Sequence, residues 1–317
     1  MRAVRCVDHQ VECAEVPEPS GEGVRVTVAS AGVCGSDLHM IEMMPLAATL
    51  GHEFAGTLDD GRLVAVEPMG ACRRCEPCLA GRPYHCENGL RTFGVDADGG
   101  MAEQCLVPES SIVLLPAGVV AGTAALVEPL AVAVHAVRLA GNVGGGRVAV
   151  IGGGTIGLCV LAALRAQGVA GIDVFARHDH QRAAVERLGA AVGERDVSGW
   201  NVVFDAAGTE KSLAQSVRMV RPGGRIILVG VYWTGTVALP AIELCMKEVQ
   251  LIPSTMYGHD GAVRDFDLAA RLLAENTDIA STLITHRFPL DAVAQAFDVA
   301  RDRASGAIKV VLEPGAR

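Results

Sequence analysis

The sequence predicts an α/β protein in which a β-rich, barrel-like domain accompanies a doubly wound parallel sheet that binds a dinucleotide. Three observations lead to this fold class. Residues 1–120 carry short apolar strands separated by Gly, Pro and Asp turns, and residues 121–256 alternate strand and helix patterns around a glycine-rich loop. Residues 257–317 return to the pattern of the first part. We therefore expect the nucleotide-binding domain to be inserted into the β-rich one.

Composition narrows the class of protein. The chain has 317 residues, 50% hydrophobic and 20% charged, which is enough for two sizeable cores. A formal net charge of −9 argues against a nucleic-acid or anionic-membrane partner, because no basic patch could dominate it. No signal peptide and no apolar run long enough to span a bilayer is expected, so the protein should be soluble and cytoplasmic. The ten cysteines then indicate metal ligands and buried thiols rather than disulfides.

The strands expected in the first domain include Val24–Val28, Phe54–Leu58 and Leu63–Val66. The first alternates apolar and polar residues, and the other two are short apolar runs with Gly and Asp-Asp turns between them. Short strands without helical periodicity are typical of a barrel-like all-β domain.

A stretch of twenty residues inside this domain contains three different residues that zinc prefers as ligands, Cys34, His52 and Glu53. Three protein ligands leave one position on the metal free, which a catalytic zinc requires. Ser36 and His39 follow the cysteine and offer a hydroxyl and an imidazole, the parts of a proton relay. The alternative is that Cys34 is a small buried hydrophobe and His52 a core histidine, but their combination favours the metal site.

A second group contains Cys72, Cys75 and Cys78, with Cys86 after seven more residues. Four thiolates at this spacing can surround one tetrahedral ion, either zinc or an iron–sulfur centre. A ferredoxin-like pattern would have a closer fourth cysteine followed by Pro, whereas Cys86 is followed by glutamate. Because the protein fills all four positions, we predict a closed, structural zinc site rather than four unrelated buried cysteines.

Glu128 is a single carboxylate in the apolar, helical stretch that begins near Ala121. A buried glutamate needs a partner. Two compatible roles remain open, a carboxylate at the metal site and an acid near the dipole of a helix N-terminus. Pro129, at an early helical position, favours the second as the immediate role.

The glycine-rich loop follows the strand Arg147–Ile151 and precedes an apolar helix that runs through Ala166. It reads Gly-x-Gly-x-x-Gly, in which Gly152 allows a tight turn, Gly154 lets the backbone approach a pyrophosphate and Gly157 lets the helix pack on the sheet. The strand before it and the helix after it favour dinucleotide binding over another glycine-rich α/β loop. We expect cofactor contacts at Gly152, Gly154, Thr155, Ile156 and Gly157. Further strands are expected at Ile172–Ala176, Val202–Ala206, Arg225–Val229 and Val249–Ile252.

The end of the second strand of this domain indicates the cofactor. NAD-binding chains place an acid there to hold the ribose 2′-hydroxyl. This strand ends Ala176-Arg177-His178, so the acid is missing and a cation stands in its place. NADP is therefore predicted rather than NAD, with Arg177 and His178 as contacts to the 2′-phosphate. The alternative is that Arg177 is an ordinary surface arginine.

On these motifs the chain resembles a zinc-containing member of the medium-chain dehydrogenase/reductase superfamily, closest to its alcohol, polyol, sorbitol and threonine dehydrogenase-like branch. The resemblance runs over nearly the whole length and also covers Gly100–Glu103, Asp205–Gly208 and Arg221–Gly224. It implies a GroES-like catalytic domain at 1–120 with a structural zinc lobe at about 70–88, a Rossmann domain at 121–256, and a return to the catalytic domain at 257–317. It also implies a homodimer or homotetramer.

The resemblance implies a role for each candidate residue. Cys34, His52 and Glu53 match the catalytic zinc ligands, Glu128 matches a carboxylate that binds this metal or lies beside it, Ser36 and His39 match the proton relay, and Cys72, Cys75, Cys78 and Cys86 match the structural zinc site. Two zinc ions per chain are thus expected. The connection from His39 to Gly51 is shorter than usual, so the identity of the substrate does not carry over.

The implied reaction is the reversible oxidation of an alcohol or polyol to a carbonyl compound with NADP⁺. One alternative is a zinc-independent enone or quinone reductase on the same fold, which the complete ligand set disfavours. Another is a non-catalytic zinc- and nucleotide-binding relative, against which the intact Ser36 and His39 count.

Overall fold

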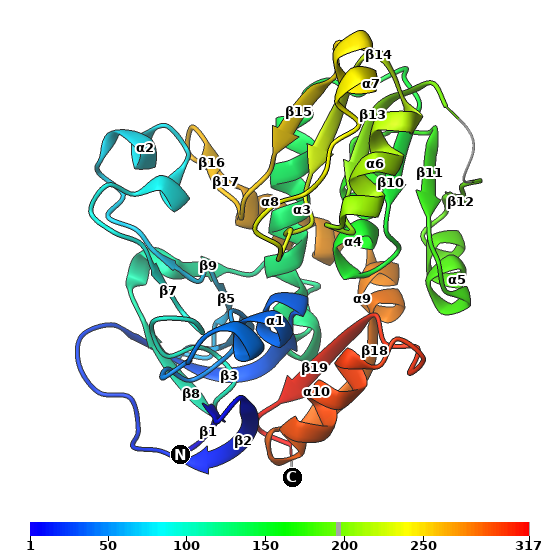
Figure 1. Ribbon diagram of the computed structural model, residues 1–317. Helices are drawn as coiled ribbons and strands as arrows, with labels where there is room; N and C mark the ends of the chain where they lie inside the picture. Colours follow the sequence, from blue (N-terminus) through cyan, green and yellow to red (C-terminus); the bar gives the residue numbers. More distant parts are fainter. Residues whose placement is uncertain (195–197, 317) are drawn as a thin grey trace. The chain divides into compact units, whose positions relative to one another are not determined.

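The computed structural model describes residues 1–194 and 198–316 and divides into two compact units. One unit is formed by Met1–Glu128 together with Tyr257–Arg317, and the other by Pro129–Met256 (Figure 1). The first unit is therefore discontinuous in the sequence, and the second is inserted into it.

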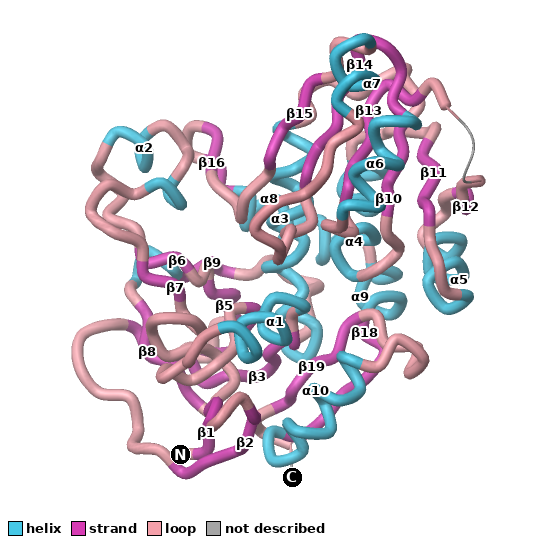
Figure 2. The backbone as a smooth tube through the Cα atoms, viewed as in Figure 1, coloured by secondary structure: helices cyan, strands magenta, loops and turns pink. Residues whose placement is uncertain are grey.

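A seven-stranded sheet forms the body of the first unit (Figure 2). Its order is β18 (Ile284–Pro289), β19 (Lys309–Glu313), β3 (Val24–Val33), β4 (Glu53–Thr57), β5 (Leu63–Val66) and β9 (Ile112–Leu114), and β8 (Gln104–Val107) also pairs with β3. Because β19 pairs antiparallel with β3, the C-terminal strand is part of the N-terminal sheet. The three strands expected here are confirmed, although β3 continues five residues further than its sequence pattern indicated.

Short elements surround this sheet. The paired strands outside it are β1 (Arg2–Val7) with β2 (Gln10–Glu15), β6 (Met69–Gly70) with β7 (Arg91–Thr92), and β16 (His259–Asp260) with β17 (Val263–Arg264). The helical segments are α2 (Glu76–Leu79), η1 (Pro83–His85), η2 (Glu109–Ser111), η3 (Ala121–Leu126), α8 (Asp265–Glu275), α9 (Thr277–Leu283), η4 (Leu290–Ala292) and α10 (Val293–Arg301).

Helix α1 (Gly35–Met43) contradicts the expectation of a purely β-like N-terminal domain. Only Asp37 and Ile41 of this helix are buried, so its sequence carries almost no apolar stripe and periodicity did not reveal it. Its local signal is a capping box, in which the Cys34 N–H donates to Asp37 Oδ2 at 2.9 Å. The helix begins directly after the first candidate metal ligand.

The second unit is built on a six-stranded parallel sheet. Its order is β12 (Ala191–Val192), β11 (Ile172–Phe175), β10 (Val148–Ile151), β13 (Trp200–Asp205), β14 (Val220–Leu228) and β15 (Gln250–Pro253). The chain starts in the middle at β10 and moves outward in both directions, so right-handed crossovers place α4 (Thr155–Ala166) and α6 (Glu210–Met219) on opposite faces. The helices α5 (Asp179–Arg187) and α7 (Ala241–Met246) complete the unit. The expected doubly wound sheet is confirmed.

Helix α3 (Val127–Leu139) continues the turn η3 and contains Glu128 in its first turn. By length and composition alone, the stretch Ala121–Leu139 could cross a membrane, although Glu128 and Arg138 interrupt it and it is not a continuous apolar run. However, 67% of its most apolar 18-residue window is buried within the protein, as in the core helix of a globular unit.

Candidate active site

Cys34, His52 and Glu53 come together at the ends of two neighbouring strands of the first unit. Cys34 follows β3, His52 precedes β4, and Glu53 is the first residue of β4. One ligand atom from each lies within 4.8 Å of the others. Gly32, the partner of Glu53 across the strands, makes room, since a Cβ there would lie 2.0 Å from Glu53 Oε2. A thiolate, an imidazole and a carboxylate in this arrangement fit a zinc ion.

The ring of His52 is oriented by Asp37, which is fully buried. His52 Nδ1 lies 3.2 Å from Asp37 Oδ1, and its Nε2 lies 3.4 Å from Ser36 Oγ. A carboxylate at the far nitrogen is the usual partner of a metal-ligating histidine. Burial alone would lower the pKa of His52, but the charges of Asp37 and Cys34 outweigh it and raise the pKa. Sequence reasoning missed Asp37, whose only signal was its place three residues after Cys34.

Ser36 lies beside this group of three ligands. Its hydroxyl donates a hydrogen bond to Cys34 Sγ at 2.9 Å. His39 follows three residues later on α1, so it shares the side of the helix on which Ser36 lies, and it is exposed. The helix thus carries one hydroxyl at the metal group and one imidazole toward water.

Glu128 lies outside the group of three ligands but close enough for its charge to act on His52 and Glu53. Only 8% of it is exposed, and burial, followed by the charge of Glu53, raises its pKa to about 8. Burial raises the pKa of the nearby Tyr257 hydroxyl, and the charge of Glu128 raises it further. The place of Glu128 in the first turn of α3 and its proximity to the metal group are both features of this structure, so the two roles expected for it remain compatible.

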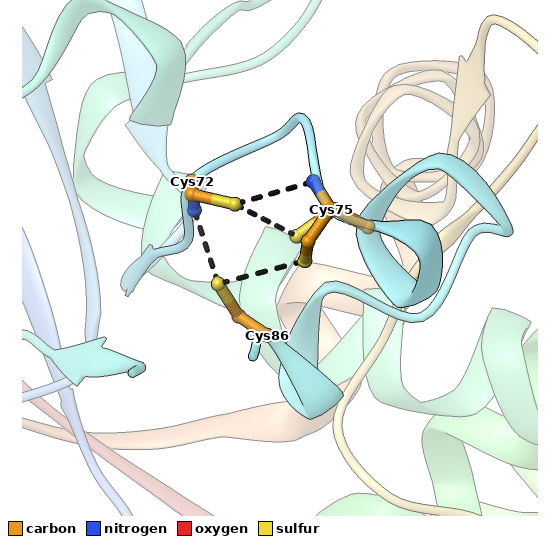
Figure 3. Close-up of side chains that lie close together, drawn as sticks. Cys72, Cys75 and Cys86 are labelled. Carbon is orange, nitrogen blue, oxygen red and sulfur yellow. Dashed lines mark hydrogen bonds between the residues drawn. The ribbon is translucent and has the colours of Figure 1, made fainter. Parts of the chain in front are cut away.

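The four cysteines of the second group bring their sulfur atoms within 4.8 Å of one another. The Cys72–Cys78 and Cys75–Cys86 sulfur pairs are 3.9 and 4.0 Å apart. Figure 3 shows the side chains of Cys72, Cys75 and Cys86, which point toward one another. A tetrahedral zinc ion with sulfur ligands at about 2.3 Å would separate them by about 3.8 Å, whereas a disulfide requires about 2.05 Å. The lobe therefore fits a closed metal site.

The surroundings of these sulfur atoms favour negative charge at one of them. The backbone N–H of Arg74 and the amide of Asn88, which donates to Cys72 Sγ at 3.2 Å, lower the pKa of the Cys72 thiol. Burial raises the pKa of Cys78. A bound cation would favour the thiolate form of all four cysteines. It would therefore offset the burial that disfavours the thiolate of Cys78.

The glycine-rich loop of the second unit has the conformation that its spacing predicts. Gly152 has φ +109°, which other residues rarely adopt, and a Cβ on Gly157 would lie 1.8 Å from Gly152 O. A Cβ on Gly154 would meet no atom within 4 Å, so this side of the loop is open at the N-terminus of α4. An open glycine beside a helix N-terminus fits a pyrophosphate.

The tip of β11 carries no acid. Ala176 is buried, and it packs so closely on the loop that a Cβ on Gly153 would lie 2.6 Å from the Ala176 Cβ. Arg177 is exposed, and His178 caps α5 with its ring stacked on that of His180 at 5.5 Å. Arg177 therefore places a positive charge where an NAD-binding chain places a carboxylate.

Two family models together match nearly the whole chain. Residues 20–117 match the alcohol dehydrogenase GroES-like domain, and residues 121–313 match the glucose dehydrogenase C-terminus. L-galactonate-5-dehydrogenase of Escherichia coli K12 is 31% identical over 320 residues, which cover 90% of this chain and 89% of the relative. The chain belongs to the zinc-containing medium-chain dehydrogenase/reductase family. It is an NAD(P)-dependent zinc alcohol or polyol dehydrogenase, which confirms the resemblance inferred from its motifs.

Solved relatives of this dehydrogenase hold either cofactor. A protein from Sinorhizobium meliloti 1021 bound to NADP has a TM-score of 0.85 at 30% identity, with 99% of each chain covered. A protein from Escherichia coli CFT073 complexed with NADH has a TM-score of 0.87 at 27% identity, again with 99% of each covered. The family therefore leaves the choice between NAD and NADP to this chain's own residues.

Proposed function

We propose that this dehydrogenase oxidises a secondary or primary alcohol within a polyhydroxylated substrate to a carbonyl compound, with NADP⁺ as the preferred cofactor. The observation that carries the proposal is the convergence of Cys34, His52 and Glu53 beside the hydroxyl of Ser36. The relative that acts on L-galactonate supports a substrate with several hydroxyl groups. A zinc-independent reductase would leave this ligand set without a role.

Cys34, His52 and Glu53 would hold the catalytic zinc, and Glu128 would remain beside it. The ion would supply the positive charge that makes an alcohol acidic near neutral pH. Asp37 keeps the Nδ1 side of His52 occupied, so Nε2 is the nitrogen left for the metal.

Ser36 would accept the proton of the alcohol. Its oxygen can accept that proton while its own hydrogen, which is directed to Cys34 Sγ in this structure, would be released through water toward His39. His39, one turn further along α1 and exposed, would pass the proton on to water. Ser36 and His39 would thus carry the proton that the reaction releases from the buried site to water.

The second unit would hold the cofactor, whose nicotinamide supplies the hydride acceptor. Its pyrophosphate would meet the backbone of the glycine-rich loop, and Arg177 and His178 would meet the 2′-phosphate. The contacts expected of the loop are Gly152, Gly154, Thr155, Ile156 and Gly157. The absence of an acid at Ala176 supports NADP, because a carboxylate there would repel the phosphate.

The second zinc would be held by Cys72, Cys75, Cys78 and Cys86. All four positions are protein thiolates, so this ion would stabilise the lobe and take no part in the reaction. Reduced thiols of this kind persist in the cytoplasm, where we propose that the enzyme works.

Steady-state assays test the reaction. A panel of alcohols, polyols and aldonic acids would be offered with NADP⁺ and with NAD⁺, before and after treatment with a chelator. We expect reduction of NADP⁺ with at least one polyhydroxylated substrate and loss of the rate on chelation. Equal turnover after complete removal of the metal from Cys34, His52 and Glu53 would contradict the proposal, as would activity restricted to enones or quinones.

We also propose a homodimer formed through the edge of the parallel sheet. Strand β15 ends the strand order, and an edge strand offers backbone donors and acceptors that a two-fold axis can pair with those of a second copy. Beside it, Ile242 and Met246 are 83% and 80% exposed. Light scattering should give twice the chain mass of 32.9 kDa, and an Ile242→Asp, Met246→Asp variant should give the chain mass. A monomeric wild-type protein would contradict this.

A further inference from the structure

A cavity of about 250 Å³ lies in the second unit, at the end of the parallel sheet where the strands begin. Its walls come from the connection 142–146 before β10, from residues 201–202 of β13, and from the bulged part of β14 at 221–225. The glycine-rich loop follows the other end of β10, a strand of four residues that spans about 13 Å. The cavity is therefore separate from the loop that would hold the pyrophosphate of the cofactor.

Two arginines line this cavity, Arg221 and Arg225, and neither forms an ion pair with a carboxylate of the described residues. Arg221 is exposed, and its Nη1 donates to the carbonyl oxygen of the adjacent Pro222 at 2.8 Å. Arg225 is half-buried and donates to the carbonyl oxygens of Ala140 and Asn142. Carbonyl oxygens satisfy these donors without neutralising their charge, so two positive charges remain at the cavity.

Arg225 also has a structural role at the end of α3. A basic side chain near the last carbonyl groups of a helix is favourable, and Gly141 makes room for it, since a Cβ there would lie 3.2 Å from Arg225 Nη1. This role occupies the two Nη groups of Arg225 and leaves Nε for another acceptor. It explains neither Arg221 nor the cavity between the two arginines and the 142–146 connection.

The 142–146 connection adds backbone donors to the same cavity. Gly144 and Gly145 form a turn, which the side chain of Asn142 fixes by accepting from the Gly144 N–H at 2.9 Å. A Cβ on Gly146 would lie 2.8 Å from Asn201 Cγ, so this end of the turn packs directly on β13. The N–H groups of Gly145 and Gly146 have no hydrogen-bond partner in the part of the chain that the structure describes. Consecutive N–H groups in a turn form a concave site for an anion.

The composition of the walls favours an anion over other ligands. None of the described residues that line the cavity is Asp or Glu, although the whole chain has a formal net charge of −9. Val143 and Val202 are the apolar side chains among them, which is too little apolar surface for a ligand held by hydrophobic contact. Guanidinium groups and backbone N–H groups are the donors that proteins use for phosphate oxygens.

We propose that this cavity binds a phosphate group, either as the free ion or as part of a small phosphorylated metabolite. Arg221 and Arg225 supply the positive charge, and the N–H groups of Gly145 and Gly146 donate to the phosphate oxygens. A bound phosphate connects the 142–146 turn to β14 and stabilises the second unit. The site goes beyond the proposed function, because it holds neither the alcohol nor the cofactor.

Calorimetric titration with inorganic phosphate, at constant ionic strength, tests the proposal on the zinc-loaded protein saturated with its nicotinamide cofactor. The cofactor then occupies the glycine-rich loop, so phosphate that still binds, and still raises the melting temperature, lies elsewhere. Glycerol 3-phosphate is titrated in parallel. Tighter binding of glycerol 3-phosphate would identify the ligand as a phosphorylated metabolite, and tighter binding of inorganic phosphate would identify it as the free ion. Binding of neither, or binding that the cofactor abolishes, would overturn the proposal.

Variants of the cavity walls place the bound phosphate. A Cβ on Gly145 meets no atom within 4 Å, and Asp and Asn tolerate its φ of +73° better than most residues. Gly145→Asp should abolish phosphate binding through its charge, whereas the matched neutral variant Gly145→Asn should retain it. Equal affinities of these two variants would overturn the proposal.

Arg221→Gln gives a second test that does not depend on the turn, since Arg221 is exposed and its loss should not disturb folding. It should weaken phosphate binding at least about tenfold, the low end for a charge-assisted hydrogen bond. Arg218→Gln, an exposed arginine of α6 outside the cavity, is the control and should leave the affinity unchanged. Undiminished affinity in Arg221→Gln would overturn the assignment of the phosphate to this cavity.

Discussion

Lys309 donates to both carboxylate oxygens of Glu53, at 2.8 and 2.7 Å, although 256 residues separate the two in the sequence. The lysine is 3% exposed and the glutamate 1%, and the Lys309 ammonium also donates to Val33 O at 3.1 Å. Burial would lower the pKa of Lys309, but the charge of Glu53 outweighs it and raises the pKa. The last strand of the chain therefore provides the hydrogen-bond partner of a candidate ligand of the catalytic zinc.

Removal of that lysine should destabilise the first unit. Lys309→Met leaves the carboxylate of Glu53 buried without its partner, which typically costs about 3–5 kcal/mol. Urea unfolding of the zinc-free protein measures its free energy of unfolding. Lys211→Met, at an exposed position on α6, is the control and should change stability by about 0.5 kcal/mol or less. A loss below about 1 kcal/mol for Lys309→Met would show that the pair is not a major support.

The two metal sites should differ in lability. The four-thiolate site is closed, whereas the Cys34, His52 and Glu53 site keeps a free position and a harder ligand set. Mild chelation should remove one equivalent of zinc and abolish activity while circular dichroism stays unchanged. Metal analysis that finds a single zinc in fully active protein would refute this expectation.

Ser36→Ala should slow the chemical step and leave the cofactor affinity unchanged. The variant removes a proton acceptor beside Cys34 and no phosphate contact, and a positioned acid–base group contributes about 10²–10⁴-fold. Single-turnover rates and the cofactor dissociation constant separate the two effects. Ser20→Ala, at an exposed position, is the control. A wild-type rate under conditions in which chemistry is limiting would remove Ser36 from the mechanism.

Residue spacing was enough to locate both metal groups because their ligands lie on short connections. Cys72 to Cys86 form one lobe, and Cys34 and Glu53 lie at the ends of two strands that pair with each other. In such cases the local chain brings the ligands together whatever the rest of the fold does. The glycine-rich loop was equally predictable, since its strand and helix are adjacent to it in sequence.

The partners of these ligands were not predictable in the same way. Lys309 reaches Glu53 only because the chain returns to the first unit after a long insertion, and residue spacing gives no sign of that return. Asp37 is different, since it stands within the motif itself. Asp37 caps α1, but this helix has almost no apolar stripe, so residue periodicity gave no sign that a helix begins there. The contact of Asp37 with His52 could therefore not be predicted.

The edge of β11 gives the sharpest prediction, because two neighbouring substitutions there change the sign of the local charge. Arg177 is exposed at a strand tip without an acid, and a charge-assisted contact of an arginine with a 2′-phosphate is worth about 1.5–3 kcal/mol. NADP⁺ should therefore exceed NAD⁺ in kcat/KM by about ten- to a hundredfold. An Ala176→Asp, Arg177→Ala double variant should reverse the order, since it restores the acid and deletes the cation.

Steady-state kinetics with both cofactors decides between three outcomes. Arg218→Ala on α6, which removes another exposed arginine, should leave the ratio of the two kcat/KM values unchanged. A clear preference for NADP⁺ that reverses in the double variant supports a bound 2′-phosphate at Arg177. Equal efficiency with both cofactors would mean that the missing acid only removes repulsion while Arg177 points into water. A preference of the wild-type enzyme for NAD⁺ would contradict the interpretation of the strand end, because no carboxylate at Ala176 is present to hold the ribose.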